Sequence, residues 1–127
     1  MADSAPTRGQ RERALSQAIQ SVYKQKLGHQ PGQVSCSIAN ERVTIVLENS
    51  VTPAEALLAE GGKDELAEEV RGELLDSLYA QLTEVIEETL ETKVVDILSD
   101  AKLESERTGI IVVLQDAPTV RPRSGKS

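Results

Sequence analysis

The chain has 127 residues, a formal net charge of −7 and only two aromatic side chains, both tyrosine. This length suits a single domain that buries about two-thirds of the surface of its unfolded chain, around a core of aliphatic side chains. The negative charge argues against nonspecific nucleic-acid binding and against adsorption to an anionic membrane, because both depend on clustered Lys and Arg. The one cysteine excludes an intrachain disulfide and fits a reducing compartment.

A single domain is expected over residues 9–116, between a disordered N-terminus at residues 1–8 and a disordered basic tail at residues 117–127. The tail combines prolines, a glycine and basic side chains with little to bury, which is typical of a solvated segment. A small basic docking peptide is the alternative. No apolar run is long enough for a signal peptide or a membrane-spanning helix, so we expect a soluble, cytoplasmic protein.

The first expected element is a helix over residues 10–27. Its apolar side chains recur at helical spacing and form one stripe, and Gly28 and Pro31 are expected to end it. The stripe consists of Leu15, Ile19, Val22, Tyr23 and Leu27.

Residues 34–39 and 43–48 are expected to form a hairpin of two strands. Apolar and polar side chains alternate in both segments, which indicates half-buried strands. Asn40-Glu41 lies where the tight turn is needed, and asparagine tolerates a positive φ. Because one face of the hairpin is apolar and the other largely polar, helices should cover only one side of the sheet.

The segment Thr52-Pro53-Ala54-Glu55 marks a sharp junction between strand and helix. Thr52 can cap the helix, Pro53 suits its first position, and Glu55 completes a capping box. The short helix that starts here is expected to end near Glu60, before two glycines that act as a hinge.

A long helix is expected over residues 63–91. Leucine, isoleucine or valine recurs in it at every fourth position, and each step of four advances this stripe by about 40° around the helix. Over six steps the stripe rotates by about 240°, so the two halves of the helix must face different partners. One partner is the sheet, and the other is either the first helix or a second copy of the chain. The stripe consists of Leu66, Val70, Leu74, Leu78, Leu82, Ile86 and Leu90.

Two last strands are expected over residues 93–99 and 107–115, with a loop over residues 100–106 between them. Residues 110–114 are apolar without interruption, which predicts a strand buried on both faces and therefore a further layer over the second face. The resulting order, α-β-β-α-α-β-β, predicts an α+β fold with a four-stranded, mostly antiparallel sheet and helices packed on it.

The surplus of apolar surface on the long helix and the last strand predicts a homodimer, because symmetric pairs are the commonest oligomers. The candidate interface residues are Leu74, Leu75, Leu78, Tyr79, Leu82, Ile111 and Val113.

Five short segments, spread over about residues 14–114, carry a resemblance to a known family. They are Gly28-His29-Gln30-Pro31-Gly32-Gln33-Val34, Val51-Thr52-Pro53-Ala54-Glu55 with Leu58, Val70-Arg71, Ile86-Glu87-Glu88 and Lys93-Val94. With these segments the chain resembles the MpsC-like family, a small bacterial family described as a component of a sodium-translocating membrane potential-generating system. The chain departs from the family pattern at Gln30 and at Glu91-Thr92, where glycine is usual.

The resemblance implies a small soluble accessory protein associated with ion or inorganic-carbon transport systems, and it supplies no catalytic residue. Within the matching segments, six residues are expected to act as a structural motif that shapes the backbone. These are Gly28, Pro31, Gly32, Thr52, Pro53 and Glu55.

No catalytic, cofactor-binding or metal-binding residue is predicted, and no cofactor. His29 is interpreted as an exposed loop histidine and Cys36 as a buried small hydrophobe, because neither a catalytic pair nor a set of metal ligands is assembled around them. Gly61-Gly62-Lys63 lacks the rest of a phosphate-binding loop. The many carboxylates of the long helix favour a solvated face over a calcium site.

The preferred hypothesis is therefore a non-enzymatic accessory or regulatory protein, a homodimer that acts through protein contacts, with a membrane transport component as a candidate partner. The alternative is a small-molecule or ion-binding sensor. Its pocket would lie between the long helix and the sheet, near residues 28–33 and the two glycines at 61–62.

Overall fold

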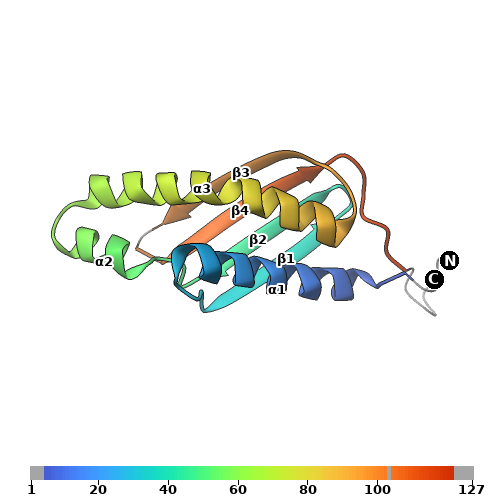
Figure 1. Cartoon of the computed structure of the whole chain (residues 1–127), viewed down its shortest axis with the longest axis horizontal. Coiled ribbons are helices and arrows are strands. Elements are labelled where there is room, and N and C mark those ends of the chain that lie inside the picture. The colour runs from blue at the N-terminus through green and yellow to red at the C-terminus, as the bar shows by residue number, and fades with distance from the viewer. Residues whose placement is uncertain (1–4, 103, 122–127) are drawn as a thin grey trace.

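Three helices and four strands make up the part of the chain described by the computed structural model, residues 5–102 and 104–121 (Figure 1). The elements are α1 (Arg8–Leu27), β1 (Gln33–Ala39), β2 (Arg42–Glu48), α2 (Pro53–Glu60), α3 (Asp64–Leu90), β3 (Val94–Lys102) and β4 (Arg107–Leu114). Their order confirms the predicted α-β-β-α-α-β-β arrangement.

The four strands form one antiparallel sheet in the order β1-β2-β4-β3. The two hairpins are joined through β2 and β4, which places β1 and β3 at the edges. Helices α1 and α3 lie side by side over one face of this sheet (Figure 1). The prediction that helices cover a single side is confirmed.

The turns and helix ends follow the local sequence. Asn40 adopts a φ of 57° in the hairpin turn, as its position predicts. Gly28 ends α1 with a φ of 67°, a left-handed conformation that side chains rarely adopt. At the start of α2, Thr52 and Glu55 form the predicted capping box with Pro53 at the first helical position.

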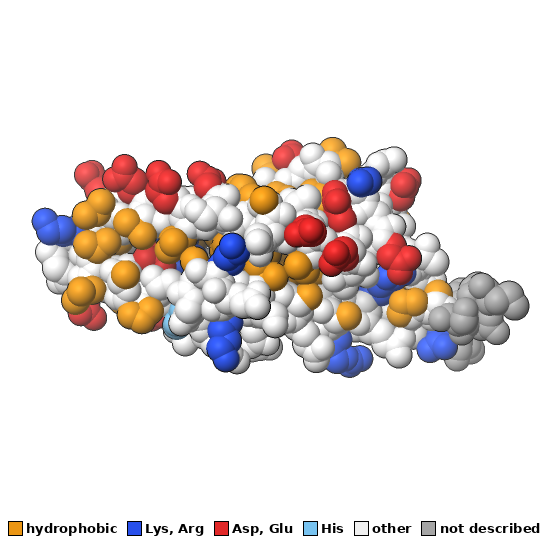
Figure 2. All heavy atoms as spheres, viewed as in Figure 1, with side chains coloured by type: hydrophobic (Ala, Val, Ile, Leu, Met, Phe, Trp, Pro, Cys, Tyr) orange, Lys and Arg blue, Asp and Glu red, His pale blue; other side chains and the backbone are white. Residues whose placement is uncertain are grey.

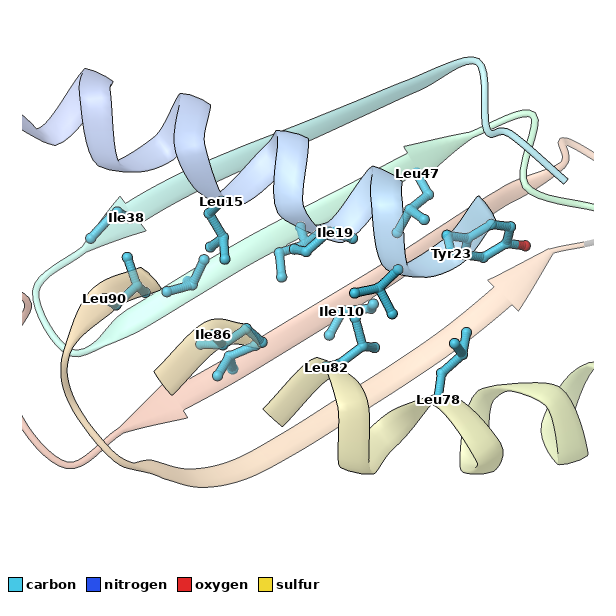
Figure 3. Packing of buried hydrophobic residues seen from close by; sticks show 14 of the residues in the cluster. Leu15, Ile19, Tyr23, Ile38, Leu47, Leu78, Leu82, Ile86, Leu90 and Ile110 are labelled. Carbon is cyan, nitrogen blue, oxygen red and sulfur yellow. The ribbon is translucent and has the colours of Figure 1, made fainter. Parts of the chain in front are cut away.

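The core lies between the sheet and the pair α1 and α3, and Figure 3 shows its side chains pointing toward one another from these elements. Apart from Tyr23, it is aliphatic, as the composition requires. The fully buried large side chains include Leu15, Ile19, Ile45, Leu47, Leu78, Ile86 and Leu90.

Within the single chain, the last strand is buried on one face only, so burial of its second face stays a prediction that depends on a partner. In β4 the alternate residues Ile110, Val112 and Leu114 are buried beneath the helices, whereas Ile111 is 47% exposed and Val113 is half-buried. Both helices lie on one face, and no described element covers the other. We call this second side of the sheet the open face.

The long helix does face two partners, but one of them differs from those considered in the sequence. The C-terminal half of α3 packs on the sheet and on α1, and it buries Leu78, Leu82, Ile86 and Leu90. The N-terminal half packs against α2 instead. There the rotated stripe leaves the core, so that Leu66 is 43% exposed and Val70 is half-buried.

The last hairpin is tighter than predicted. Strand β3 runs to Lys102, so residues 100–102 belong to the strand and not to the loop. A register shift between Val94 and Asp96 marks a β-bulge at the beginning of β3. The bulge places Val95 outside the regular pairing, and its side chain is exposed.

The two expected disordered ends, residues 1–8 and 117–127, extend beyond the described residues at 1–4 and 122–127. In the described part, Thr7 caps α1 and its side chain accepts a hydrogen bond from the backbone of Gln10. At the other end, the Arg11 guanidinium donates to the carbonyl of Thr119, and the backbone amide of Arg121 donates to the carbonyl of Pro6. The two described ends therefore lie together beside α1 (Figure 1).

Candidate functional site

A buried ion pair joins α3 to α2. The Arg71 side chain is 5% exposed and that of Glu55 is fully buried. Arg71 Nε donates to Glu55 Oε2 at 2.6 Å, and Nη2 donates to Oε1 at 2.8 Å. This two-pronged geometry is the one that a guanidinium and a carboxylate form best, and lysine cannot reproduce it.

Further hydrogen bonds extend the ion pair into a network. Glu55 Oε1 also accepts from the backbone amide and the hydroxyl of Thr52, at 2.9 and 2.7 Å. The Arg71 guanidinium donates to the carbonyl of Ser50 at 2.6 Å and to the hydroxyl of Tyr23 at 3.1 Å. The network thereby connects α1, the β2–α2 connection, α2 and α3.

All polar side-chain groups of this network have partners, and in the described residues no buried side-chain nitrogen or oxygen lacks one. The Tyr23 hydroxyl donates to the Ser50 carbonyl. Burial raises the pKa of Tyr23, an effect that the nearby Arg71 charge partly offsets, so the hydroxyl stays protonated and can donate. The network holds the charges of Arg71 and Glu55 out of water, and it fixes α2 and α3 to the rest of the domain.

The loop after α1 packs beside the same network. His29 Nε2 lies 2.9 Å from the carbonyl oxygen of Asn49, next to Ser50 in the chain. The backbone amide of Gly32 donates to the carbonyl of Glu48. A Cβ at position 32 would lie 3.1 Å from the Cβ of Asn49, so the close approach favours glycine. Pro31 is buried in this contact region.

Two single residues considered in the sequence analysis, His29 and Cys36, are not part of a catalytic or metal-binding arrangement among the described residues. The His29 ring contacts only the Asn49 carbonyl and the edge of Tyr23 among the described interactions. Cys36 is half-buried, and burial raises its pKa to about 11, so its thiol stays protonated at neutral pH. Among the described residues, no group of three or more His, Cys, Asp or Glu is placed to hold a metal ion.

The predicted interface residues divide between the core and the surface. Leu75, Leu78 and Leu82 are buried in the core of the single chain. Leu74 and Tyr79 are half-buried, and the Tyr79 hydroxyl forms a hydrogen bond with that of Ser99 on β3. Ile111 and Val113 lie on the open face. An interface role stays a prediction, and the exposed surface that it needs comes from the last two.

The strand register defines the open face row by row. Leu98, Ile111, Thr44 and Ser37 lie opposite one another across the four strands. The next row on one side contains Val113, and the next on the other contains Val46. Leu98 is 52% exposed, so the apolar centre of this face lies on β3 and β4. Charged side chains flank it toward both ends of the strands.

A cleft with a volume of about 760 Å³ lies between the N-terminal half of α3 and the end of β3. Its lining mixes apolar and charged residues, among them Leu75, Tyr79, Asp64, Glu68 and Asp76. The sensor hypothesis placed a pocket between the long helix and the sheet, and a cleft is present there. Its lining residues Ala59 and Asp64 flank the two glycines at 61–62, as predicted, but no residue of 28–33 lines it, so that part of its predicted position is wrong.

The chain matches a known protein family over most of its length. The model of the family described as "Na+-translocating membrane potential-generating system (MpsC)" matches residues 7–116. The chain belongs to the MpsC family. Comparisons with curated proteins and with solved structures return no match. Over residues 5–102 and 104–121, no helix combines the length and the apolar character that crossing a membrane requires.

Three of the segments that carried the MpsC resemblance meet at the buried network. The segment around Thr52 and Glu55 supplies the carboxylate, Val70-Arg71 supplies the guanidinium, and the loop that begins at Gly28 packs against Asn49. The motif of this MpsC-family chain therefore builds one structural joint rather than separate features.

The sequence analysis missed the pairing of Glu55 with Arg71. A signal was present, because Arg71 stands four residues after Ala67 and four before Leu75, and both of these are buried. An arginine on the apolar face of a helix needs a buried partner. The spacing alone did not indicate that this partner is the capping glutamate of the preceding helix.

Proposed function

We propose that this MpsC-family protein is a non-enzymatic accessory protein that acts through protein contacts, and that it forms a homodimer through the open face. The proposal extends to its partner: a component of the transport system that the family description names. The single observation that carries the proposal is the exposed apolar centre of a sheet that no described element covers.

The apolar centre suits packing against another sheet. Leu98 and Ile111 are directly opposite each other, with exposed fractions of 52% and 47%. Val113 and Val46, both half-buried, continue the apolar surface in the neighbouring rows. Two sheets that pack face to face bury alternate residues of this kind.

The charges of the open face favour a second copy of the same chain. Basic and acidic side chains are balanced on this face, although the chain as a whole carries a net charge of −7. A symmetric pair therefore meets no excess of like charge, and opposite charges flank the apolar centre. The basic residues are Arg42, Lys102 and Arg107, and the acidic residues are Glu48, Asp96 and Asp100.

Two further observations support a non-enzymatic role. The strongest polar constellation, around Arg71 and Glu55, is buried and internally satisfied. The Cys36 thiol, with a pKa of about 11, is a poor nucleophile at neutral pH. The buried ion pair and the Cys36 thiol are therefore poor candidates for catalytic groups.

Light scattering after size exclusion tests the dimer. Wild-type protein is expected at twice the mass of one chain, and Ile111→Lys at the mass of one chain, because a lysine ammonium would be buried without a partner at the centre of the interface. Leu57→Lys is the matched control: it places the same charge at a residue of α2 that is 70% exposed, and the dimer should persist. The measurement is repeated over a series of protein concentrations. A wild-type protein that is monomeric at all of them would contradict the proposal, and so would equal dissociation of both variants.

The cleft between α3 and β3 supports a second candidate function, a small-molecule or ion-binding sensor. Its volume of about 760 Å³ lies within the usual range of ligand pockets. A ligand that prefers the native state must raise the melting temperature. In a thermal-shift screen of nucleotides, bicarbonate and cations, a stabilising compound should lose its effect in Tyr79→Ala, while Leu57→Ala, away from the cleft, should retain it. No shift with any compound contradicts the sensor function.

A further inference from the structure

We propose that the outer surface formed by α2 and the N-terminal half of α3 binds a basic amphipathic helix of a partner protein. We call it the hairpin surface. The inference rests on the proposed function, an accessory protein that acts through contacts, and it assigns the heterologous contact to a surface separate from the open face. The hairpin surface is made of Leu57, Leu66, Val70 and Leu74 with Glu65, Glu69 and Glu73.

The apolar part of the hairpin surface is unusually open. Leu57 and Leu66 are 70% and 43% exposed, and Val70 and Leu74 are half-buried. Leu66, Val70 and Leu74 follow one another at intervals of four, so they form a continuous row along one side of α3. Figure 2 shows hydrophobic side chains gathered over α2 and this half of α3, on the side of the molecule where the helices lie.

An acidic row runs along the same stretch of α3. Glu65, Glu69 and Glu73 are exposed and also recur at intervals of four. Residues three apart on a helix are neighbours, so Glu69 lies beside Leu66 and Glu73 beside Val70. In Figure 2 a line of acidic side chains borders the hydrophobic area at the left of the view.

No basic side chain on either helix neutralises this acidic row. Arg71 is the one basic residue within α2 and α3, and it is buried against Glu55. The described ion pairs include none of these three glutamates, and the nearest other basic residue in the chain is Lys63 at the N-cap of α3. The row therefore presents a net negative charge beside an apolar strip. A second copy of this chain would bring the same negative charge to the contact, which disfavours self-association through the hairpin surface.

A helix with one apolar face and a basic edge complements these two rows. Its leucine-type side chains would cover the strip on α3 and α2, and its Lys or Arg side chains would meet Glu65, Glu69 and Glu73. Laying an amphipathic helix into an apolar groove is a recurring mode of peptide recognition. An anionic bilayer fits poorly, because the carboxylates would be repelled by its headgroups.

The buried network makes the hairpin surface rigid before any partner arrives. Arg71 and Glu55 hold α3 against α2, and the guanidinium also donates to the Ser50 carbonyl. A surface whose helices are already fixed loses little conformational entropy on binding.

Titration with synthetic peptides tests the inference. The probe is a fluorescent amphipathic peptide of leucine and lysine, compared with a peptide in which glutamate replaces lysine and with a scrambled peptide of the same composition. Anisotropy should report binding of the leucine–lysine peptide, weakened by salt, with the other two far weaker. Leu66→Ser should weaken binding roughly tenfold, the scale that follows from losing one buried apolar contact.

Reversing the charge of the acidic row gives a more specific test of the inference. Glu69→Lys with Glu73→Lys should abolish binding of the lysine peptide and create binding of the glutamate peptide. Glu84→Lys with Glu88→Lys, at exposed positions in the other half of α3, changes the net charge equally and should leave the preference for the lysine peptide intact. Circular dichroism of all variants verifies that they are folded.

Several results would overturn the inference: no binding of the lysine peptide by wild-type protein, equal loss in both charge-reversed variants, or equal binding of the scrambled peptide. Stronger binding to vesicles of phosphatidylglycerol than to the peptide would also overturn it, in favour of a membrane surface. The same titration with Ile111→Lys, which is expected to be a monomer, separates the two proposals. The variant should still bind the peptide, because its substitution lies on the open face. A wild-type protein that is a monomer and binds the peptide would contradict the dimer alone.

Discussion

Replacing Arg71 by alanine is expected to lower the free energy of unfolding by about 3–5 kcal/mol, the range for breaking a buried ion pair by removing one partner. The change leaves the Glu55 carboxylate, which is fully buried, without its charged partner, and it removes donors from the Ser50 carbonyl and the Tyr23 hydroxyl. Urea unfolding followed by circular dichroism measures the effect.

Two comparisons separate the ion pair from the loss of side-chain volume. Arg71→Lys keeps the charge but not the two-pronged geometry, so it should destabilise less than alanine and still measurably. The double variant Arg71→Met with Glu55→Gln should cost less than the sum of its two single changes, because each single change leaves a partner unpaired. Full additivity, or a loss below about 1 kcal/mol for Arg71→Ala, would contradict the role of the network.

The elements of the fold were predictable because their signals are local. The junction at Thr52 depends on three neighbouring residues that form the capping box, and the structure contains it as predicted. Gly28 at the end of α1 and Asn40 in the hairpin turn meet backbone conformations that few other residues adopt easily. Alternation in the first hairpin, likewise, depends only on period two.

The sequence was less informative where the burial of a side chain depends on which element packs against it. The apolar run at residues 110–114 is equally consistent with a strand buried on both faces and with one buried face beside an exposed apolar face. Ile111 at 47% exposure shows that the second alternative applies within the single chain. In the same way, the rotation of the α3 stripe predicts two partners for the helix but does not identify α2 as one of them.

The candidate site was only partly predictable for a related reason. The sequence assigns Glu55 to the capping box, which is correct at short range, and gives Arg71 no partner of its own. Their contact spans 16 residues and depends on how α2 folds back on α3 at Gly61 and Gly62, where Gly62 adopts a φ of 79°. Such a contact is a property of the tertiary arrangement, which local spacing does not encode.

Leu78→Ala is expected to destabilise the protein by about 2–5 kcal/mol, the usual cost of a leucine truncated in a core. Leu78 on α3 is 1% exposed and packs against α1 and the sheet (Figure 3). A small apolar void of about 10 Å³ already adjoins it, barely the volume that one water molecule needs. Truncation would enlarge this void, because the surrounding strands and helices relax only partially into the space that the leucine leaves. Urea unfolding gives the value.

The same variant decides whether Leu78 belongs to the core or to an interface between copies, the role that its place in the rotating stripe suggested. A core residue loses the same stability in the wild-type background and in the Ile111→Lys background, because the two sites act independently. If Leu78 were an interface residue, its truncation would lower the stability only in the background in which the dimer forms.

Leu78→Met, which conserves volume, should cost less than about 1.5 kcal/mol. Leu57→Ala, on the exposed side of α2, should change stability by no more than about 0.5 kcal/mol. If Leu78→Ala lowers the stability no more than Leu57→Ala does, α3 does not pack on the sheet as described. The assignment of the open face, which depends on α3 covering the opposite side of the sheet, would then fail.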